Sequence, residues 1–226
     1  MPRQAGGERL VMDEERRARE EVIKVCRKLA DKGLIAATDG NVSCRVALER
    51  LLVTPSGQPK GTLQPVDLLL VDDRGEVLAG YGRPSSEIRM HLEVYRQRPE
   101  IAAVVHAHPP MLTALTLAGL PFPAEALPEV WLTFGSVPTA PYATPATAEV
   151  PAAIAPYLKK HQAVLLERHG SLTLGKTLEE AYLRLEKLEH AATVFFYARL
   201  LGQDSITPLP AASLEKLEAL KRRLQH

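Results

Sequence analysis

Apolar side chains are spaced at helical intervals near the start of the chain and at strand intervals after it. Residues 13–32 carry apolar positions three or four residues apart, which predicts a helix, and Gly33 follows where a C-terminal cap belongs. Short apolar runs then predict strands over residues 41–46, 51–54, 68–71 and 76–79. The last two runs flank an Asp-Asp-Arg-Gly turn, so we expect them to pair as a hairpin.

Helix and strand signals alternate through the middle of the chain. Ser85 or Ser86 is expected to cap a helix that runs to about Arg98. Residues 102–108 predict a short strand. The two prolines after it can open a helix to about Gly119, because the first amides of a helix need no internal partner.

The C-terminal half completes the pattern. A capping box is expected at Thr177 and Glu180, at the start of a long helix. The predicted elements are a strand within residues 136–142, a helix over 146–160, strands over 163–167 and 172–174, and helices over 177–201 and 213–225. Because strands occur in hairpins and also alternate with helices, we expect an α/β fold whose mostly antiparallel or mixed sheet is covered by helices on both faces.

Composition and charge add few constraints. The 226 residues, 46% apolar and 24% charged, suit one soluble globular domain, and the net charge of +1 with no long basic block indicates neither a nucleic-acid nor a membrane partner. The N-terminus lacks the apolar core of a signal peptide, so we expect a cytoplasmic protein. Cys26 and Cys44 fit that compartment as free thiols, although a Cys–His metal site is conceivable.

Three histidines form the strongest chemical signal. On a strand, His106 and His108 point to the same face, so both imidazoles can reach one ion. Zinc prefers four nitrogen, sulfur or oxygen ligands, and His169, in a polar turn after a buried run, is the best third candidate. Gly170 after it would let another segment or a ligand approach closely. Alternatively, His106 and His108 are ordinary half-buried histidines. Weaker candidates are His91, His161, His190 and His226.

Three polar segments, residues 38–43, 54–57 and 84–87, are candidate anion sites. Exposed amides and hydroxyls bind anions, above all at a helix start, although each segment alone is equally consistent with a plain turn or cap. Glu87 is expected in the first turn of a helix. It either complements the helix dipole, supplies a fourth metal ligand or acts as a base that removes a proton beside a carbonyl. The last role needs a raised pKa, which a dry pocket can provide.

Together these segments resemble the class II aldolase/epimerase family, which includes L-fuculose-1-phosphate aldolase and L-ribulose-5-phosphate 4-epimerase. The resemblance covers roughly residues 15–200, with the motifs in the family's order. They are Gly40-Asn41-Val42-Ser43, Thr54-Pro55-Ser56-Gly57, Pro84-Ser85-Ser86-Glu87, His106-Ala107-His108, Pro141-Tyr142-Ala143 and Arg168-His169-Gly170. The resemblance implies a three-layer α/β/α sandwich on a mostly antiparallel central sheet. It implies a single domain over residues 1–226, with polar residues 1–12 and a helical tail over 205–226.

The resemblance also implies roles for individual residues. His106, His108 and His169 are similar to the family's Zn²⁺ ligands, although another divalent metal is possible at such a site. Glu87 resembles the catalytic acid/base, which also approaches the metal in the empty site. The phosphate of the substrate is expected on Asn41, Ser56, Gly57, Ser85 and Ser86. Family members are similar in being homotetramers with active sites between subunits.

The implied activity is that of a zinc-dependent aldehyde-lyase. A ketose 1-phosphate similar to L-fuculose 1-phosphate is cleaved to dihydroxyacetone phosphate and a small aldehyde such as L-lactaldehyde, with Lewis-acid stabilisation of the enediolate. Glutamate at Glu87 resembles the aldolases, because the epimerases carry aspartate there. L-ribulose-5-phosphate 4-epimerase and methylthioribulose-1-phosphate dehydratase activities are the alternatives on the same fold.

Two departures from the family concern the aldehyde half of the substrate. The fuculose aldolases place a tyrosine proton donor where this chain has Leu127, so Glu125 or Glu129 is either its replacement or a surface carboxylate. The tail, residues 213–226, lacks the tyrosine that closes the site in those enzymes. A structural module without metal is a weaker alternative, because the three histidines and Glu87 are all present. A zinc hydrolase is also a weaker alternative, because it would not need three loops suited to binding a phosphate.

Overall fold

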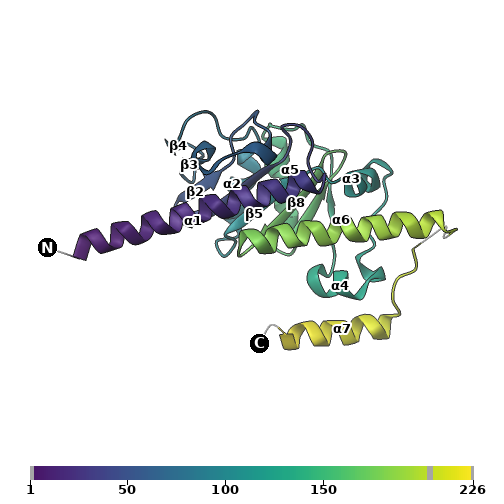
Figure 1. Cartoon of the computed structure of the whole chain (residues 1–226). Coiled ribbons are helices and arrows are strands. Elements are labelled where there is room, and N and C mark those ends of the chain that lie inside the picture. The colour runs from purple at the N-terminus through teal and green to yellow at the C-terminus, as the bar shows by residue number, and fades with distance from the viewer. Residues whose placement is uncertain (1–2, 203–205, 225–226) are drawn as a thin grey trace.

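Within residues 3–202 and 206–224, which the computed structural model describes, the centre of the molecule is a sheet of eight strands (Figure 1). The strands are β1 (Asn41–Ala47), β2 (Arg50–Val53), β3 (Leu69–Val71), β4 (Val77–Ala79), β5 (Ala103–Ala107), β6 (Thr139–Ala140), β7 (Ala163–Leu166) and β8 (Gly170–Gly175). They lie in the order β4-β3-β2-β1-β5-β8-β7-β6. The sheet is mixed, because β6 and β7 pair parallel while the other neighbours pair antiparallel.

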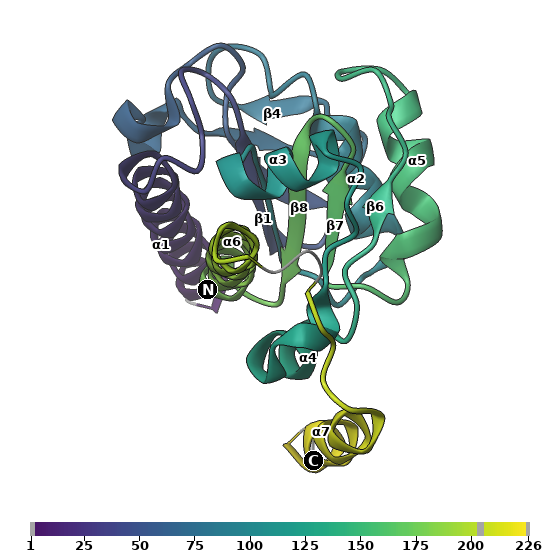
Figure 2. The same ribbon diagram turned by 90° about the vertical axis from the view of Figure 1, so that its right-hand side faces the viewer.

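Helices lie on both faces of this sheet (Figure 2). They are α1 (Arg3–Asp31), α2 (Ile88–Gln97), α3 (Pro110–Leu117), α4 (Pro128–Phe134), α5 (Glu149–Leu158), α6 (Leu178–Leu200) and α7 (Ala211–Leu224). α1 and α6 lie side by side on one face, and α2 and α5 pack together on the other. α7 lies against α4, away from the sheet. In the described ranges, no helix is both long and apolar enough to cross a membrane.

Alternate side chains of β5 enter two separate apolar clusters. Ala103, Val105 and Ala107 pack with residues of α1 and α6, whereas Val104 packs with residues of α2 and α5. Because successive strand residues point to opposite faces, His106 lies on the face of Val104. β5 is therefore buried on both faces, and the polar ring of His106 must find its partners inside the protein.

Most elements lie where the apolar pattern predicts them, with ends shifted by a few residues. The strands β1, β2, β5, β7 and β8, the β3–β4 hairpin, and the helices α2, α3, α5, α6 and α7 are confirmed. The predicted end of the last helix, at Gln225, lies outside the described residues. The strand expected within residues 136–142 is reduced to Thr139–Ala140.

Two helices differ from the expectation. α1 begins at Arg3 instead of residue 13, because residues 3–12 are rich in helix-forming residues but carry no apolar stripe that would reveal a helix. α4 was not predicted at all. It begins with Pro128 at its first position, where proline suits a helix although the surrounding prolines suggest a loop.

The predicted helix caps are correct only in part. α2 begins at Ile88 with Glu87 at its N-cap, so the expectation that Ser85 or Ser86 caps this helix is wrong. Instead, the hydroxyl of Ser85 accepts a hydrogen bond from the amide of Glu87 at 3.3 Å. At α6 the hydroxyl of Thr177 accepts from the amide of Glu180 at 3.1 Å, as predicted. The carboxylate of Glu180 accepts from the amide of Lys176, however, and not from that of Thr177.

β5 and β8 approach each other most tightly at Gly170. A Cβ atom at this position would lie 2.3 Å from the backbone O of Ala107 and 2.9 Å from Cδ2 of His108. The close approach expected at this glycine is confirmed, and the approaching segment is the end of β5.

We predict that Gly170→Ala lowers the free energy of unfolding by about 3 kcal/mol, because the added methyl overlaps paired backbone that cannot move independently. Urea denaturation measures this loss. Gly119→Ala is the control, since its Cβ would meet nothing within 4 Å and only its positive φ is unfavourable. The control substitution should lower the free energy of unfolding by about 1 kcal/mol. An equal or smaller loss for Gly170→Ala would contradict the packing argument.

Candidate active site

Three histidine side chains meet at one end of β5. His106 lies in β5 and His108 just after it, while His169 lies in the turn between β7 and β8. The ring centroids of the three pairs are 4.8–4.9 Å apart. The antiparallel register, in which Ala107 is opposite Ser171, brings this turn to the end of β5.

Glu87 joins the three histidines from the start of α2. Its Oε2 lies 3.2 Å from Nε2 of His106, and its Oε1 lies 3.2 Å from Nε2 of His169. One ligand atom from each of these residues and from His108 lies within 4.8 Å of all the others. The residues expected to hold a metal are therefore brought together from segments far apart in the sequence.

A hydrogen bond behind the ring of His106 turns its Nε2 towards the centre of this group. Nδ1 of His106 donates to the backbone O of Ser171 at 3.0 Å. Nδ1 of His108 lies 3.5 Å from Oδ2 of Asp39, and its Nε2 lies 2.9 Å from Nε2 of His106. Nitrogen lone pairs and a carboxylate at these distances repel one another unless a proton or a cation lies between them.

The chemistry of these groups fits a zinc ion. Imidazole nitrogen and carboxylate oxygen are zinc ligands, and Oε1 of Glu87 is buried without a hydrogen-bond partner. Burial is the largest cause that lowers the pKa of His108 to about 4, and repulsion from His106 and His169 contributes to the same lowering. Burial works to raise the pKa of Glu87, but His106 and His169 together hold it far below its usual range. Neutral His108 and ionised Glu87 are the protonation states that bind a cation.

Four of the expected phosphate residues lie on two adjacent loops at the start of α2. The amide of Ser56 donates to the backbone O of Arg83 at 2.9 Å, and the amide of Ser85 donates to that of Thr54 at 3.2 Å. Residues 54–57 and 83–86 therefore run side by side. Of the expected phosphate residues on these loops, Ser56, Gly57 and Ser86 are exposed and Ser85 is buried.

Asn41, the fifth expected phosphate residue, is turned towards Glu87. Its Nδ2 donates to Oε2 of Glu87 at 2.9 Å, and its Oδ1 lies 2.6 Å from Nε2 of His91. His91, one of the weaker metal candidates, does not belong to the group of residues that could hold a metal. Its four-residue spacing from Glu87 was the signal that both side chains share one face of α2.

Lys60 is a residue near the site that the sequence did not reveal. Its side chain is buried, and its Nζ donates to the backbone oxygens of Thr38 and Gln58 at 2.8 Å each. Burial lowers the pKa of Lys60, while Asp39 and Glu87 are among the charges that raise it. The ammonium joins the loop before β1 to the loop after β2. A single lysine after a proline gives no pattern that predicts this contact.

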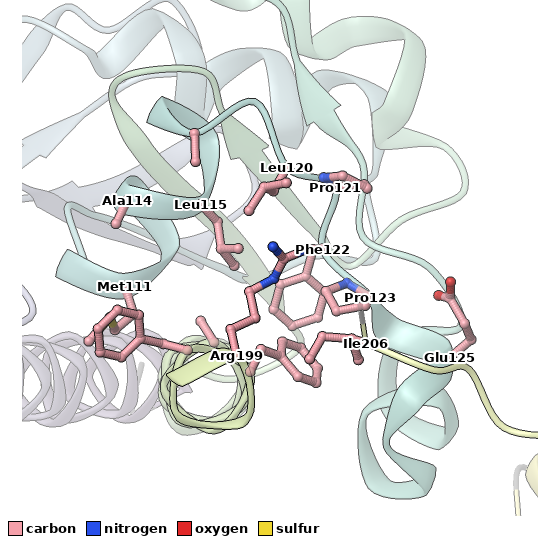
Figure 3. Close-up of a pocket in the computed structure, with 14 residues that line it drawn as sticks. Met111, Ala114, Leu115, Leu120, Pro121, Phe122, Pro123, Glu125, Arg199 and Ile206 are labelled. Carbon is pink, nitrogen blue, oxygen red and sulfur yellow. The ribbon is translucent and has the colours of Figure 1, made fainter. Parts of the chain in front are cut away.

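An apolar pocket of about 420 Å³ lies apart from these residues (Figure 3). It is formed by α3, the segment 118–125, the end of α6 and Ile206, and it contains none of the expected metal-binding or phosphate-binding residues. Glu125, a candidate replacement for the tyrosine proton donor, lines this pocket and is not part of the histidine group.

The two cysteines lie in the core as free thiols, as expected. Burial is the main cause that raises the pKa of both Cys26 and Cys44 to about 12, so neither is a ready thiolate. Among the described residues, neither belongs to a group able to hold a metal.

The chain belongs to the family described as Class II Aldolase and Adducin N-terminal domain, whose model matches residues 20–196. This confirms the resemblance that the motifs suggested. The relatives of the chain include a decarboxylase and an aldolase.

Three similar proteins illustrate the range of the family. The chain is 35% identical to a 3-oxo-tetronate 4-phosphate decarboxylase of Pectobacterium atrosepticum, covering 91% of this chain and 94% of that protein. It is 31% identical to an L-fuculose phosphate aldolase of Escherichia coli, covering 91% and 93%. The crystal structure of YgbL from Escherichia coli superposes on this chain with a TM-score of 0.82 at 34% identity, covering 90% of this chain and 98% of that one.

We predict that zinc raises the melting temperature of the chelator-treated protein through this group. At a free zinc concentration a hundred times the Kd, the stabilisation is about 2.7 kcal/mol. His169→Ala should remove most of the shift, because the group loses one of its nitrogen ligands. His161→Ala is the control, since His161 is half-exposed and lies outside the group. A shift that survives in His169→Ala would place the zinc elsewhere.

We also predict a specific loss of stability in acid. Burial, followed by repulsion from His106, lowers the pKa of His91 to about 3, whereas an unfolded histidine titrates near 6.5. The unfolded state therefore binds more protons, and stability falls as the pH drops from about 6.5 towards 3. At pH 5, proton uptake by His91 in the unfolded state should have lowered the free energy of unfolding by about 2 kcal/mol. Urea unfolding at pH 7 and pH 5 should show a larger loss for the wild type than for His91→Gln, and equal losses would refute the assignment.

Proposed function

We propose that this protein is a divalent-metal lyase that breaks a carbon–carbon bond beside the carbonyl group of a small phosphorylated sugar. The observation that carries the proposal is the convergence of one ring nitrogen from each of three histidines and of the Glu87 carboxylate within 4.8 Å of one another. Three imidazoles and a carboxylate suit zinc better than the oxygen-preferring magnesium or calcium. The proposed metal ligands are His106, His108, His169 and Glu87.

A divalent cation held there supplies Lewis-acid stabilisation for negative charge that develops on the substrate oxygens. Glu87 is the proposed acid/base. Its Oε2 accepts from Asn41, whereas its Oε1 makes no hydrogen bond and is the oxygen available to exchange a proton. When the carbon–carbon bond breaks, the electron pair of that bond enters an enediolate. Glu87 would take up a proton from water and deliver it to the enediolate carbon.

The substrate phosphate is proposed to lie against the two adjacent loops. The amides of Gly57 and Ser86 and the hydroxyls of Ser56, Ser85 and Ser86 are donors of the kind that bind phosphate. The start of α2 adds its positive end. Asn41 has one N–H besides the one that it gives to Glu87. The buried ammonium of Lys60 stands behind the loop after β2 and favours an anion there.

Two substrates lead to the same enediolate. An aldol cleavage of a ketose 1-phosphate such as L-fuculose 1-phosphate leaves the enediolate of dihydroxyacetone phosphate and releases an aldehyde. Loss of carbon dioxide from 3-oxo-tetronate 4-phosphate leaves the same enediolate, because the carboxylate is attached to the carbon next to the carbonyl carbon. Protonation then gives dihydroxyacetone phosphate in both reactions. Either reaction therefore makes the same demands on Glu87 and the phosphate loops.

Decarboxylation is a second candidate because of Leu127. In an aldol cleavage, the hydroxyl on the leaving carbon must lose its proton to become an aldehyde, which is the task of the family's tyrosine. Carbon dioxide leaves without any such proton transfer. Leu127 is apolar and packs against the core, so it supplies no proton acceptor. The similarity to a 3-oxo-tetronate 4-phosphate decarboxylase supports the same reading.

The experiment is a coupled assay for dihydroxyacetone phosphate, with L-fuculose 1-phosphate and 3-oxo-tetronate 4-phosphate offered separately. Detection of L-lactaldehyde or of carbon dioxide identifies the partner product. We expect chelator-sensitive release from one of them. We expect Glu87→Gln to lower kcat by about a hundredfold to ten-thousandfold, since it removes proton transfer but keeps the size of the side chain.

Glu93→Gln is the matched control, because Glu93 lies on the same helix and pairs with Arg96 instead of the histidines. It should retain wild-type turnover. Release of neither product from a zinc-loaded protein would refute the lyase, and L-ribulose 5-phosphate and methylthioribulose 1-phosphate would then test the epimerase and dehydratase alternatives. Equal activity of Glu87→Gln and the wild type would remove Glu87 from the mechanism.

A further inference from the structure

A row of hydrogen bonds runs from Glu87 into the interior of the protein. Nδ2 of Asn41 lies 2.9 Å from Oε2 of Glu87, and Oδ1 of Asn41 lies 2.6 Å from Nε2 of His91. Oγ of Ser43 lies 2.6 Å from Nδ1 of His91 and 2.8 Å from the hydroxyl of Tyr95. The four residues behind Glu87 are between 1% and 5% exposed, so water does not compete for these bonds.

The row arises from two sequence spacings that meet. Glu87, His91 and Tyr95 are four residues apart, which places them on one face of α2. Asn41 and Ser43 are two residues apart, which places them on one face of β1. Side chains from the helix and the strand alternate along the row. It is therefore part of the packing of α2 against the sheet and cannot shift unless these elements move.

The row has a single consistent direction. Ionised Glu87 only accepts, so Asn41 must present Nδ2 to it and turn Oδ1 towards His91. The proton of His91 then lies on Nε2. Because burial keeps His91 neutral, its Nδ1 accepts from Ser43, and Ser43 in turn accepts from Tyr95. Every bond in the row donates towards Glu87.

This arrangement holds an orientation and does not conduct protons. The amide of Asn41 neither gains nor loses a proton near neutral pH, so a proton cannot pass through it to Glu87. Burial also raises the pKa of Tyr95 well above its usual value, so its hydroxyl remains protonated. The function of the row must therefore lie in the geometry that it imposes.

We infer that His91, supported by Ser43 and Tyr95, is a positioning residue that fixes the Asn41 amide and, through it, the Glu87 carboxylate. An Asn41 side chain without this partner can rotate its oxygen towards Glu87, where the two oxygens repel. Donation from Nε2 of His91 to Oδ1 prevents that rotation. Oε2 of Glu87 is then tied to Asn41 and Oε1 is left for the proton or the cation. The inference rests on the acid/base role proposed for Glu87.

The first test compares His91→Leu with His91→Gln in the dihydroxyacetone phosphate assay, with the substrate that the wild type accepts. Partners one step behind a metal or catalytic group typically change affinity or activity by about tenfold to a hundredfold, and we expect a fall in kcat of that size for His91→Leu. KM should change less than kcat, because Asn41 is the one proposed phosphate residue that His91 contacts by a hydrogen bond. His91→Gln should recover most of kcat, since its amide can donate to Asn41.

A milder pair of variants guards against misfolding. Tyr95→Phe and Tyr182→Phe each remove one buried, hydrogen-bonded hydroxyl, but that of Tyr182 donates to Glu186 at 3.3 Å and has no link to the row. Both should lose a comparable amount of stability, and only Tyr95→Phe should lower kcat. Equal kcat in the two variants, together with no recovery in His91→Gln, would reduce the row to a structural role and overturn the inference.

Two further readouts separate this inference from the proposed reaction. If the wild type releases no dihydroxyacetone phosphate, the proposed reaction is wrong, but the zinc affinity still reports the position of Glu87. Competition with a chromophoric chelator should then show about tenfold weaker zinc binding in His91→Leu and smaller losses in His91→Gln. The ¹⁵N spectrum of the His91 ring should show the neutral form with its proton on Nε2. Unchanged zinc affinity, or a proton on Nδ1, would overturn the inference.

Discussion

The antiparallel pairing of β5 with β8 is the contact on which the candidate site depends. With Ala107 opposite Ser171, the turn after β7 reaches the end of β5, and Gly170 gives room for the backbone of Ala107. His169 is then a neighbour of His106, although it lies in a different part of the sequence. Both side chains are held by paired strands, and such rigid support suits a metal site, whose ligands must lie within about 0.5 Å of their working positions.

A second close contact aligns β1 with the same end of β5. A Cβ atom on Gly40 would lie 2.6 Å from Cγ2 of Ile35 and 3.0 Å from the backbone O of His106. The glycine thus lets the loop before β1 pass directly over β5. Asn41, the next residue, can therefore stand beside Glu87 and connect the metal-ligating group to the interior row of hydrogen bonds.

Electrostatics links the stability of the site to its function. Glu87 and the histidine nitrogens bring acceptors together in a part of the protein with little water, which costs free energy unless positive charge balances it. Hydrogen bonds from Asn41, and from Nδ1 of His106 to the backbone, hold the acceptors in place, while a cation would offset their repulsion. An arrangement of acceptors that is unfavourable by itself is suited to bind a metal, and such a conflict is common at functional sites.

The sequence alone determined most strands and helices, because apolar spacing reports which face of an element is buried. It also singled out His106, His108, His169 and Glu87, because motifs preserve the order of chemical groups along the chain. Only the tertiary structure decided that these four meet, and that His91 and Lys60 stand behind the site. The physical reason is that hydrogen bonds between a helix and a strand depend on their packing distance and register, and no local pattern of residues encodes these.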